Sequence, residues 1–261
     1  MAFTVHAVMP GVWHIVDCMG VCMTLLEGEN AAMLVDTGYG IEDVADFMRH
    51  MTDLPLTVFL THNHHDHAMG ARCFPETYML EADMADWRMF TDDKMRRQVL
   101  TQAIGKNLPV DEKTFLAGEI PLPKVMKPGV IDLGGLTAEI IEAPGHTPGS
   151  AVVYVPERKL LLSGDDWNPC TWLFFPQALG LREYRSNMRG IQQLPFEKVL
   201  CPHREALYDR WMFDDFFNAL TDGNLRAAEP VNIAPYEQID TCQATLPHDQ
   251  VLVFDWAKSG L

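Results

Sequence analysis

Residues 61–67 read Thr-His-Asn-His-His-Asp-His and hold four histidines and one aspartate. Imidazole nitrogens and carboxylate oxygens are donors that zinc accepts in proteins. In an extended loop, side chains two residues apart project to the same side, so His62 and His64 can share one ion. Asp66 and His67 begin the next turn and can reach a second ion. Because adjacent residues cannot all serve one tetrahedral site, the segment predicts two metal ions.

Three further candidate ligands each follow an apolar stretch that is typical of a strand. His146 lies in Ala-Pro-Gly-His-Thr-Pro-Gly, Asp165 in Ser-Gly-Asp-Asp and His203 in Cys-Pro-His-Arg. Loops at strand ends are where a rigid sheet presents functional groups. We expect His146 to complete a set of three nitrogens with His62 and His64. We expect His203 to join Asp66 and His67.

Asp165 has the chemistry of a bridge between the two ions, because a carboxylate has two oxygens where an imidazole offers one lone pair. Two cations lower the pKa of a bridging water and hold hydroxide near neutral pH. We therefore assign catalytic roles to Asp66 and Asp165. The predicted step is attack of hydroxide on an electrophilic carbon or phosphorus. The neighbouring Asp166 is a second candidate for the bridge.

Taken in order, these residues resemble the complete ligand set of the metallo-β-lactamase-like superfamily, over roughly residues 12–205. The resemblance implies an α/β fold, a four-layer αββα sandwich, and the metal ligands His62, His64, Asp66, His67, His146, Asp165 and His203. The segment 34–38, Leu-Val-Asp-Thr-Gly, resembles the early strand and turn of that family. It implies that Asp36 is a structural carboxylate under the site. Glyoxalase II-like thioesterases and lactonases share the two histidine motifs and are the implied relatives.

The resemblance also orders the functional alternatives. Flavodiiron-type oxidoreductases tend to carry a carboxylate where this chain has His64, so two zinc ions are favoured, with iron or manganese as alternatives. The leading hypothesis is a dinuclear zinc hydrolase of a small ester, thioester, lactone or related acyl compound. A second is a mononuclear iron oxidoreductase resembling persulfide dioxygenases, with His62, His64 or His146 and Asp165 on the iron. A third is a non-catalytic metal-binding member of the fold.

The elements that must position these residues are visible in the apolar pattern. Strands are predicted at 12–17, 21–27, 31–36, 56–60, 136–143, 151–155, 159–163, 198–201 and 251–256. Helices are predicted at 41–51, 184–194 and 208–220. Strand blocks and helices in both halves favour two packed sheets with helices outside. We interpret residues 1–261 as a single domain with a helical and loop insertion near 81–128, in which Thr91 is a candidate N-cap.

Composition narrows the class of protein. The 261 residues are 48% hydrophobic, and the formal net charge is -16. An acidic chain of this kind argues against nucleic acid or anionic membranes as general partners, so the expected partner is a small-molecule substrate, and a homodimer is left open. The start resembles no secretory signal, which predicts a cytoplasmic protein. Six cysteines without a CxxC pair are read as small core thiols. The aromatic segment 167–175 is read equally as packing or as a wall of the substrate site.

Overall fold

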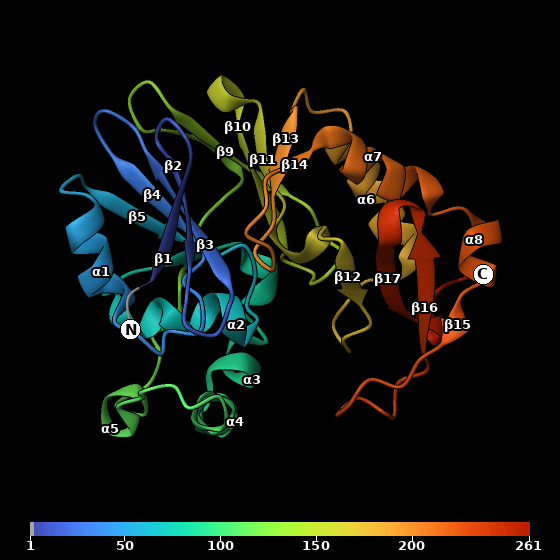
Figure 1. The fold of residues 1–261 in the computed structure, drawn as a ribbon, viewed down its shortest axis with the longest axis horizontal. Coiled ribbons are helices and arrows are strands. Elements are labelled where there is room, and N and C mark those ends of the chain that lie inside the picture. The colour runs from blue at the N-terminus through green and yellow to red at the C-terminus, as the bar shows by residue number, and fades with distance from the viewer. Residues whose placement is uncertain (1–2) are drawn as a thin grey trace.

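The computed structural model describes residues 3–261, which form two large sheets and a third, smaller one (Figure 1). The first sheet has the order β1 (Thr4–Met9), β2 (Val12–Val16), β3 (Cys22–Glu27), β4 (Ala32–Val35), β5 (Leu56–Phe59), β6 (Tyr78–Met79) and β7 (Lys124–Val125). The second has the order β14 (Tyr208–Asp209), β13 (Lys198–Leu200), β11 (Leu160–Leu162), β10 (Ala151–Val155), β9 (Thr137–Glu142) and β8 (Gly129–Asp132). The third has the order β12 (Cys170–Leu173), β17 (Gln250–Asp255), β16 (Thr241–Leu246) and β15 (Glu229–Pro230).

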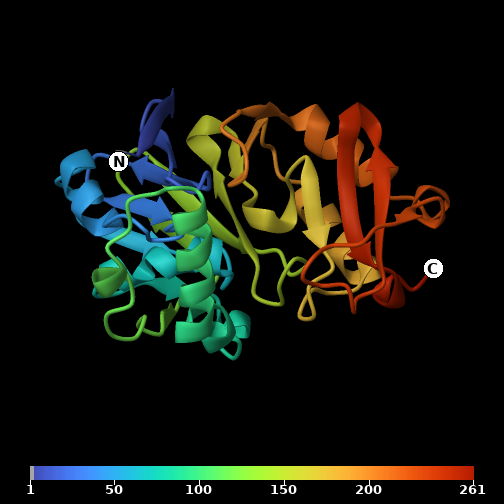
Figure 2. The ribbon, with the colours of Figure 1, turned by 60° about the horizontal axis from the view of Figure 1, so that its bottom comes forward.

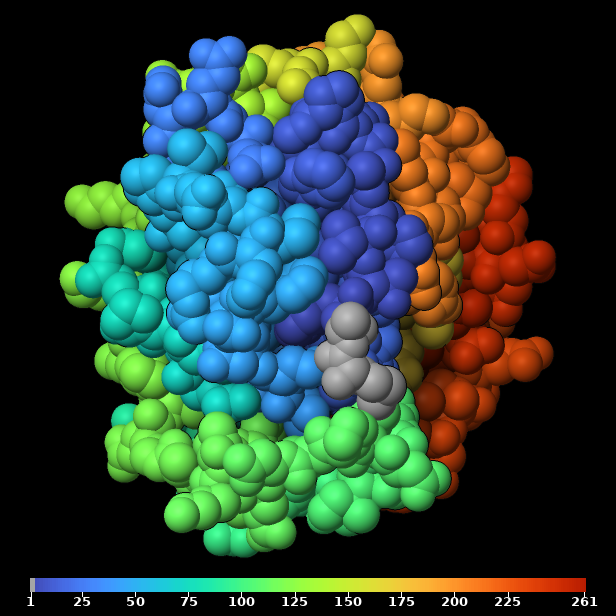
Figure 3. Space-filling model, turned by 60° about the vertical axis from the view of Figure 1, so that its left-hand side comes forward, coloured from blue at the N-terminus to red at the C-terminus, as the bar shows by residue number. Residues whose placement is uncertain are grey.

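The first two sheets pack face to face. The side chains of β4 point alternately into the core between the sheets and toward the outer face of the first sheet. Met33 and Val35 belong to the core between the sheets, together with Val153 of β10. Ala32 and Leu34 point to the opposite face and pack under helix α1 (Val44–Met51). Successive side chains of a strand face opposite ways, so a strand buried on both sides is apolar throughout. Figure 3 views the outer side of this half, where α1 covers the sheet.

The outer face of the second sheet is covered by α6 (Leu181–Ile191) and α7 (Arg210–Ala219), which share one apolar core with it. The αββα sandwich is therefore confirmed. The small third sheet packs into the same core through Leu252 and Phe254, with α8 (Asp222–Arg226) beside it. Only its strand at 250–255 was predicted from the sequence. Its other strands are short or lie in loop-like sequence, which carries little periodicity.

Residues 81–128 contain α3 (Trp87–Thr91), α4 (Asp93–Gly105) and α5 (Glu112–Phe115), which lie together on one side of the first half (Figure 1). The prediction that Thr91 caps the second helix is wrong. Its hydroxyl donates to the carbonyl of Trp87, and the side chain of Asp92 accepts from the backbone N–H of Met95 at the start of α4. That these residues form an insertion in a single domain stays a prediction.

The strand directions bring the predicted ligand loops to one edge. β4 is parallel to β5 in the first sheet, and β11 is parallel to β13 in the second, so within each sheet the loops after these strands leave at one edge. The backbone N–H of Ala151 donates to the carbonyl oxygen of Thr61 at 3.0 Å, which brings the two edges together. The 143–150 turn lies there too, because Ala151 pairs with Glu142 and Val153 with Leu162. The remaining helices are short: α2 (His65–Ala68) and the 3-10 turns η1 (Met69–Cys73), η2 (Glu81–Asp83), η3 (Pro156–Arg158), η4 (Gly164–Asp166), η5 (Pro247–Asp249) and η6 (Trp256–Lys258). Within residues 3–261 no helix combines the length and apolarity that crossing a bilayer requires.

Candidate metal centre

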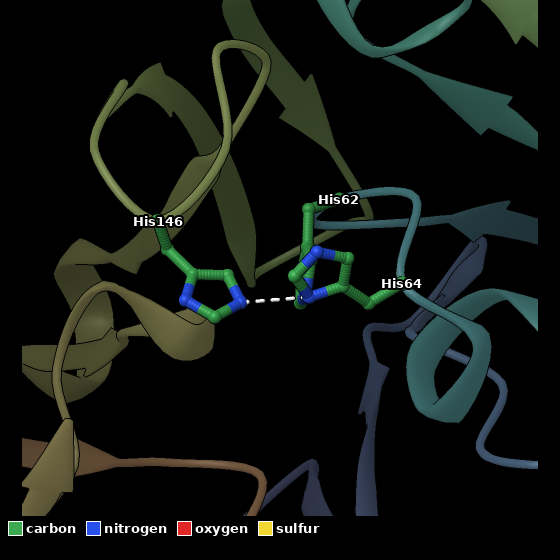
Figure 4. A group of neighbouring side chains, drawn as sticks. All are labelled: His62, His64 and His146. Carbon is green, nitrogen blue, oxygen red and sulfur yellow. Dashed lines mark hydrogen bonds between the residues drawn. The ribbon is translucent and has the colours of Figure 1, made fainter. Parts of the chain in front are cut away.

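All seven predicted ligands meet at this edge of the two sheets. Their donor atoms form three overlapping groups in which every donor lies within 4.8 Å of the others: His62, His64 and His146; His62, His67 and Asp165; Asp66, His67 and His203. The first group combines two residues of the 61–67 loop with one from the second half of the chain, and the three rings converge in Figure 4. The predicted division into a three-nitrogen set and a set of Asp66 with two histidines corresponds to the first and third groups.

In the three-histidine group, each outward-facing ring nitrogen has a hydrogen-bond partner. Nδ1 of His62 lies 3.0 Å from the Thr61 hydroxyl, and Nδ1 of His146 lies 2.7 Å from the carbonyl oxygen of Trp172. The nitrogens left for the centre are therefore Nε2 of these two histidines and Nδ1 of His64, which is 2.8 Å from Nε2 of His146 (Figure 4). Partners on the outer nitrogens orient imidazole ligands and select their tautomer.

Asp165 lies between the histidines of both halves. One of its carboxylate oxygens is 3.4 Å from Nε2 of His67, 3.5 Å from Nε2 of His146 and 3.9 Å from Nε2 of His62. Nε2 of His203 is 3.1 Å from the same carboxylate. A carboxylate in this position can serve two cations, as the sequence predicts for a bridging ligand.

Asp166 faces away from this cluster. Its Oδ1 accepts the backbone N–H of His146 at 2.9 Å. Burial raises the pKa of Asp166 well above its usual value. Asp166 therefore supports the 143–150 turn from behind, and Asp165 is the aspartate that reaches the histidines.

Asp36 lies beneath the cluster, as the resemblance implied. It sits in the left-handed region at φ 65, directly after β4, and accepts from the backbone N–H of Thr61 at 2.7 Å. Its other oxygen is 3.0 Å from Nδ1 of His67. One carboxylate thus holds the start of the 61–67 loop and turns Nε2 of His67 toward Asp165.

The electrostatics of the two histidine sets differ. Burial and neighbouring histidines hold the pKa of His62 and of His64 well below the usual value, so both rings are neutral donors. Burial also disfavours charge on His67, but Asp165, Asp66 and Asp36 outweigh it and raise the pKa of His67 well above its usual value. Burial opposes ionisation of Asp66 as well, yet the histidines around it lower its pKa to about 2. A metal ion in the second set would therefore bind in competition with protons.

These residues fit a pair of metal ions. Nε2 of His62 and Nε2 of His67 are buried and have no hydrogen-bond partner among residues 3–261. Buried polar atoms normally have a hydrogen-bond partner. Two buried nitrogens that have none and lie near a buried carboxylate fit the ligands of a cation. A donor set of histidines and aspartates suits zinc and also iron or manganese. We propose that the seven predicted ligands hold the ions, with Asp165 between them.

Asp83 is a supporting residue that sequence reasoning missed. Its buried carboxylate accepts from the N–H of Asn63 at 3.2 Å, the hydroxyl of Thr147 at 2.7 Å and the N–H of Gly149 at 2.6 Å. It therefore ties the loop of the first histidines to the turn that carries His146. A Cβ at Gly149 would lie 2.6 Å from the backbone nitrogen of Asp83, so this contact requires glycine. Asp83 lies in a stretch without any motif, and no sequence signal marks it.

Replacing Asp83 with alanine should loosen the centre before any metal binds. Three buried donors would lose their shared acceptor, and we expect the free energy of unfolding to fall by about 3 kcal/mol. Urea denaturation of the metal-depleted protein measures the effect. Glu81→Ala, on the same 3-10 turn but exposed, is the matched control. Equal stability of the two variants would contradict the assigned role.

A cavity of about 720 Å³ opens onto the metal centre. Its lining includes His64, Asp66, His146, Asp165 and His203, and its walls are largely apolar: Phe90, Met95, Val99, Trp172, Phe175 and Tyr236. One wall of the cavity comes from α3 and α4, and the other comes from the 172–175 region and the 231–240 segment. All of these segments lie on the same side of the molecule (Figures 1 and 2). The aromatic segment 167–175 has both of the expected roles: Trp172 and Phe175 line the cavity, while Trp167 and Phe174 are core residues.

All six cysteines are free thiols.

Comparison with known proteins identifies the family. Residues 16–203 match the family model of the metallo-beta-lactamase superfamily. The chain belongs to this superfamily. Over 202 residues it is 25% identical to the Gallus gallus protein named acyl-coenzyme A thioesterase MBLAC2, a match that covers 69% of this chain and 70% of that relative. The prediction of this family from the sequence is confirmed.

Solved structures show the same fold at low sequence identity. The metallo-beta-lactamase family protein TTHA1429 from Thermus thermophilus matches with a TM-score of 0.60 at 20% identity, over 85% of this chain and 82% of that one. TTHA1623, solved in a di-iron-bound form, matches with a TM-score of 0.53 at 20% identity, over 76% and 94%. The metallo-β-lactamase superfamily fold is thus shown by sequence and by structure.

Proposed function

We propose that this protein is a metal-dependent hydrolase of esters or thioesters whose acyl group is apolar. The observation that carries the proposal is the large cavity with apolar walls that opens directly on the histidine and aspartate cluster. A concave apolar site with a few convergent polar groups is typical of a small-molecule site. Similarity to a protein named as an acyl-coenzyme A thioesterase supports the thioester class.

Two divalent cations bound here would supply hydroxide near neutral pH and polarise a substrate carbonyl. The chain's own contribution is to orient the donors and exclude water. Asp66 lies 3.7 Å from Nε2 of both His67 and His203. Asp165 contacts His203 of the second set and His146 of the first. These two carboxylates are the groups placed to hold and orient a reacting water by hydrogen bonds.

The acyl group would lie between the two apolar walls. Phe90 and Phe175 pack on the ring of His64, with centroid distances of 4.5 and 4.8 Å, so an apolar chain in this cavity ends beside the metal centre. Arg204 is exposed and lines the same cavity. It can pair with an anionic group on the part of the substrate outside the apolar walls.

The proposal is tested by metal content and hydrolysis measured on the same sample. We expect about two zinc ions per chain, turnover of acyl thioesters or esters, and loss of turnover after chelation with recovery on adding zinc. One iron per chain with oxygen consumption would instead support the persulfide dioxygenase-like alternative. Bound metal without turnover across thioesters, esters, lactones and β-lactams would support the non-catalytic alternative.

Chain length should control the rate. Each methylene buried in the cavity contributes about 0.8 kcal/mol, so kcat/KM should rise about fourfold per carbon until the cavity is full. Met95→Trp should shift the optimum to shorter chains, because the larger side chain occupies the cavity. Met89→Trp is the control, since Met89 is exposed on α3 and lies outside the lining. A flat dependence on chain length in the wild-type protein would refute the apolar acyl site.

A further inference from the structure

The loop of residues 174–180, between β12 and α6, lies against the three-histidine group. The ring of Phe175 is 4.8 Å from that of His64 and 5.4 Å from that of His146. The side-chain amide of Gln177 reaches Nε2 of His64 at 2.6 Å. This loop therefore touches the outer nitrogen of the one histidine that faces the centre through Nδ1.

The chemistry of His64 determines what it needs from Gln177. If Nδ1 gives its lone pair to a cation, Nε2 carries the ring proton and must donate it. The Oε1 atom of Gln177 is a buried acceptor that lacks a hydrogen-bond partner among the described residues. A half-turn of the amide exchanges its oxygen and nitrogen and places Oε1 against Nε2–H. One rotation thus satisfies both the orphaned oxygen and the required tautomer.

Lys258, in the 3-10 turn η6, holds this loop in place. Its ammonium donates to the carbonyl oxygens of Phe175 at 3.3 Å, Pro176 at 2.6 Å and Ala178 at 3.0 Å. A Cβ at Gly180 would lie 2.8 Å from the carbonyl oxygen of Lys258, so the two segments are in close contact. Three carbonyls on one half-buried ammonium fix the backbone on both sides of Gln177.

We propose that Gln177 is a positioning residue for the metal ligand His64, and that Lys258 holds Gln177 in register. The side-chain oxygen Oε1 of Gln177 accepts a hydrogen bond from Nε2–H of His64, and this bond directs Nδ1 into the three-histidine group. Residues more than a hundred positions apart in the sequence would then set the affinity of this metal site. The inference rests on metal binding, as the proposed function does, and is independent of the acyl substrate.

Three glutamine variants test the contact. Gln177→Met removes the acceptor at nearly constant length, and Gln177→Glu restores one. Gln102→Met makes the same change on an exposed residue of α4 at the far side of the cavity. Zinc dissociation constants are measured by competition with a chelating dye, without any substrate. We expect Gln177→Met to weaken the three-histidine site by about 10–100-fold, Gln177→Glu to bind within a few-fold of wild type, and Gln102→Met to match it.

Lys258→Met provides a second route that leaves both Gln177 and His64 unchanged. We expect weaker zinc binding in the same site, because the loop is released from its three-carbonyl contact. The Tm of each metal-depleted variant separates loss of zinc affinity from loss of folding. Nitrogen-15 spectra of the zinc-bound protein add a direct readout: the proton of His64 should lie on Nε2.

Zinc binding by Gln177→Met equal to wild type would overturn the inference, as would a proton on Nδ1 of His64. Failure of Gln177→Glu to restore affinity would also overturn it, because an acceptor alone should suffice. The proposed function fails separately. A protein that binds zinc and responds to Gln177→Met but hydrolyses no acyl compound keeps the inference and loses the activity.

Discussion

His64→Ala is expected to abolish hydrolysis and to leave the three-histidine group with two nitrogens. His64 is buried and neutral, and its Nδ1 faces Nε2 of His146 at 2.8 Å, so alanine removes a donor that no neighbour replaces. A bound cation stabilises a transition state by several kcal/mol, and kcat/KM should therefore fall by about 10³-fold or more. Metal analysis should show the loss of about one ion per chain.

The matched control is His50→Ala. His50 is exposed on α1 and its Nδ1 bonds the carbonyl of Asp46 at 2.8 Å, on the outer side of the first sheet. The activity and metal content of His50→Ala should equal those of the wild type. Full activity in His64→Ala would remove the three-histidine site from the mechanism, whatever the control shows.

Asp165→Asn is expected to cause the second large loss. Its carboxylate reaches histidines of both sets at 3.1–3.9 Å, and the amide removes the negative charge that they share. Removing one partner of a buried ion pair costs about 3–5 kcal/mol, so kcat/KM should fall by about 10²–10⁴-fold. We also expect weaker binding of the metal held by Asp66, His67 and His203, measured by chelator competition.

Asp166→Asn separates the bridge from its neighbour. Asp166 accepts the N–H of His146, and asparagine keeps an acceptor oxygen of the same size. Burial raises the pKa of Asp166, which already favours its neutral form, so the neutral amide is a close substitute. Activity should stay within about threefold of wild type. Equal losses in Asp165→Asn and Asp166→Asn would contradict the assignment of the bridge to Asp165.

Local sequence determined much of this protein. The apolar run at 31–36 predicted a strand, and the chain has one at 32–35 that is buried on both faces. The histidine-rich segment after β5 predicted a metal centre because its donors are adjacent in the chain. The later ligands His146, Asp165 and His203 were found because each follows an apolar strand, and parallel strands deliver their loops to one edge.

Other features depend on contacts that only the folded chain makes. Nothing near Asp83 or Gln177 marks them in the sequence, because the partners of Asp83 lie 20 to 66 residues away and that of Gln177 lies 113 residues away. Which nitrogen of each histidine faces the centre depends on acceptors such as Asp36 and the carbonyl of Trp172, which belong to other segments of the chain. Periodicity and motif spacing report short-range geometry and donor chemistry. The cavity walls, the third sheet and the supports of the ligands arise from packing between distant segments, which no local pattern encodes.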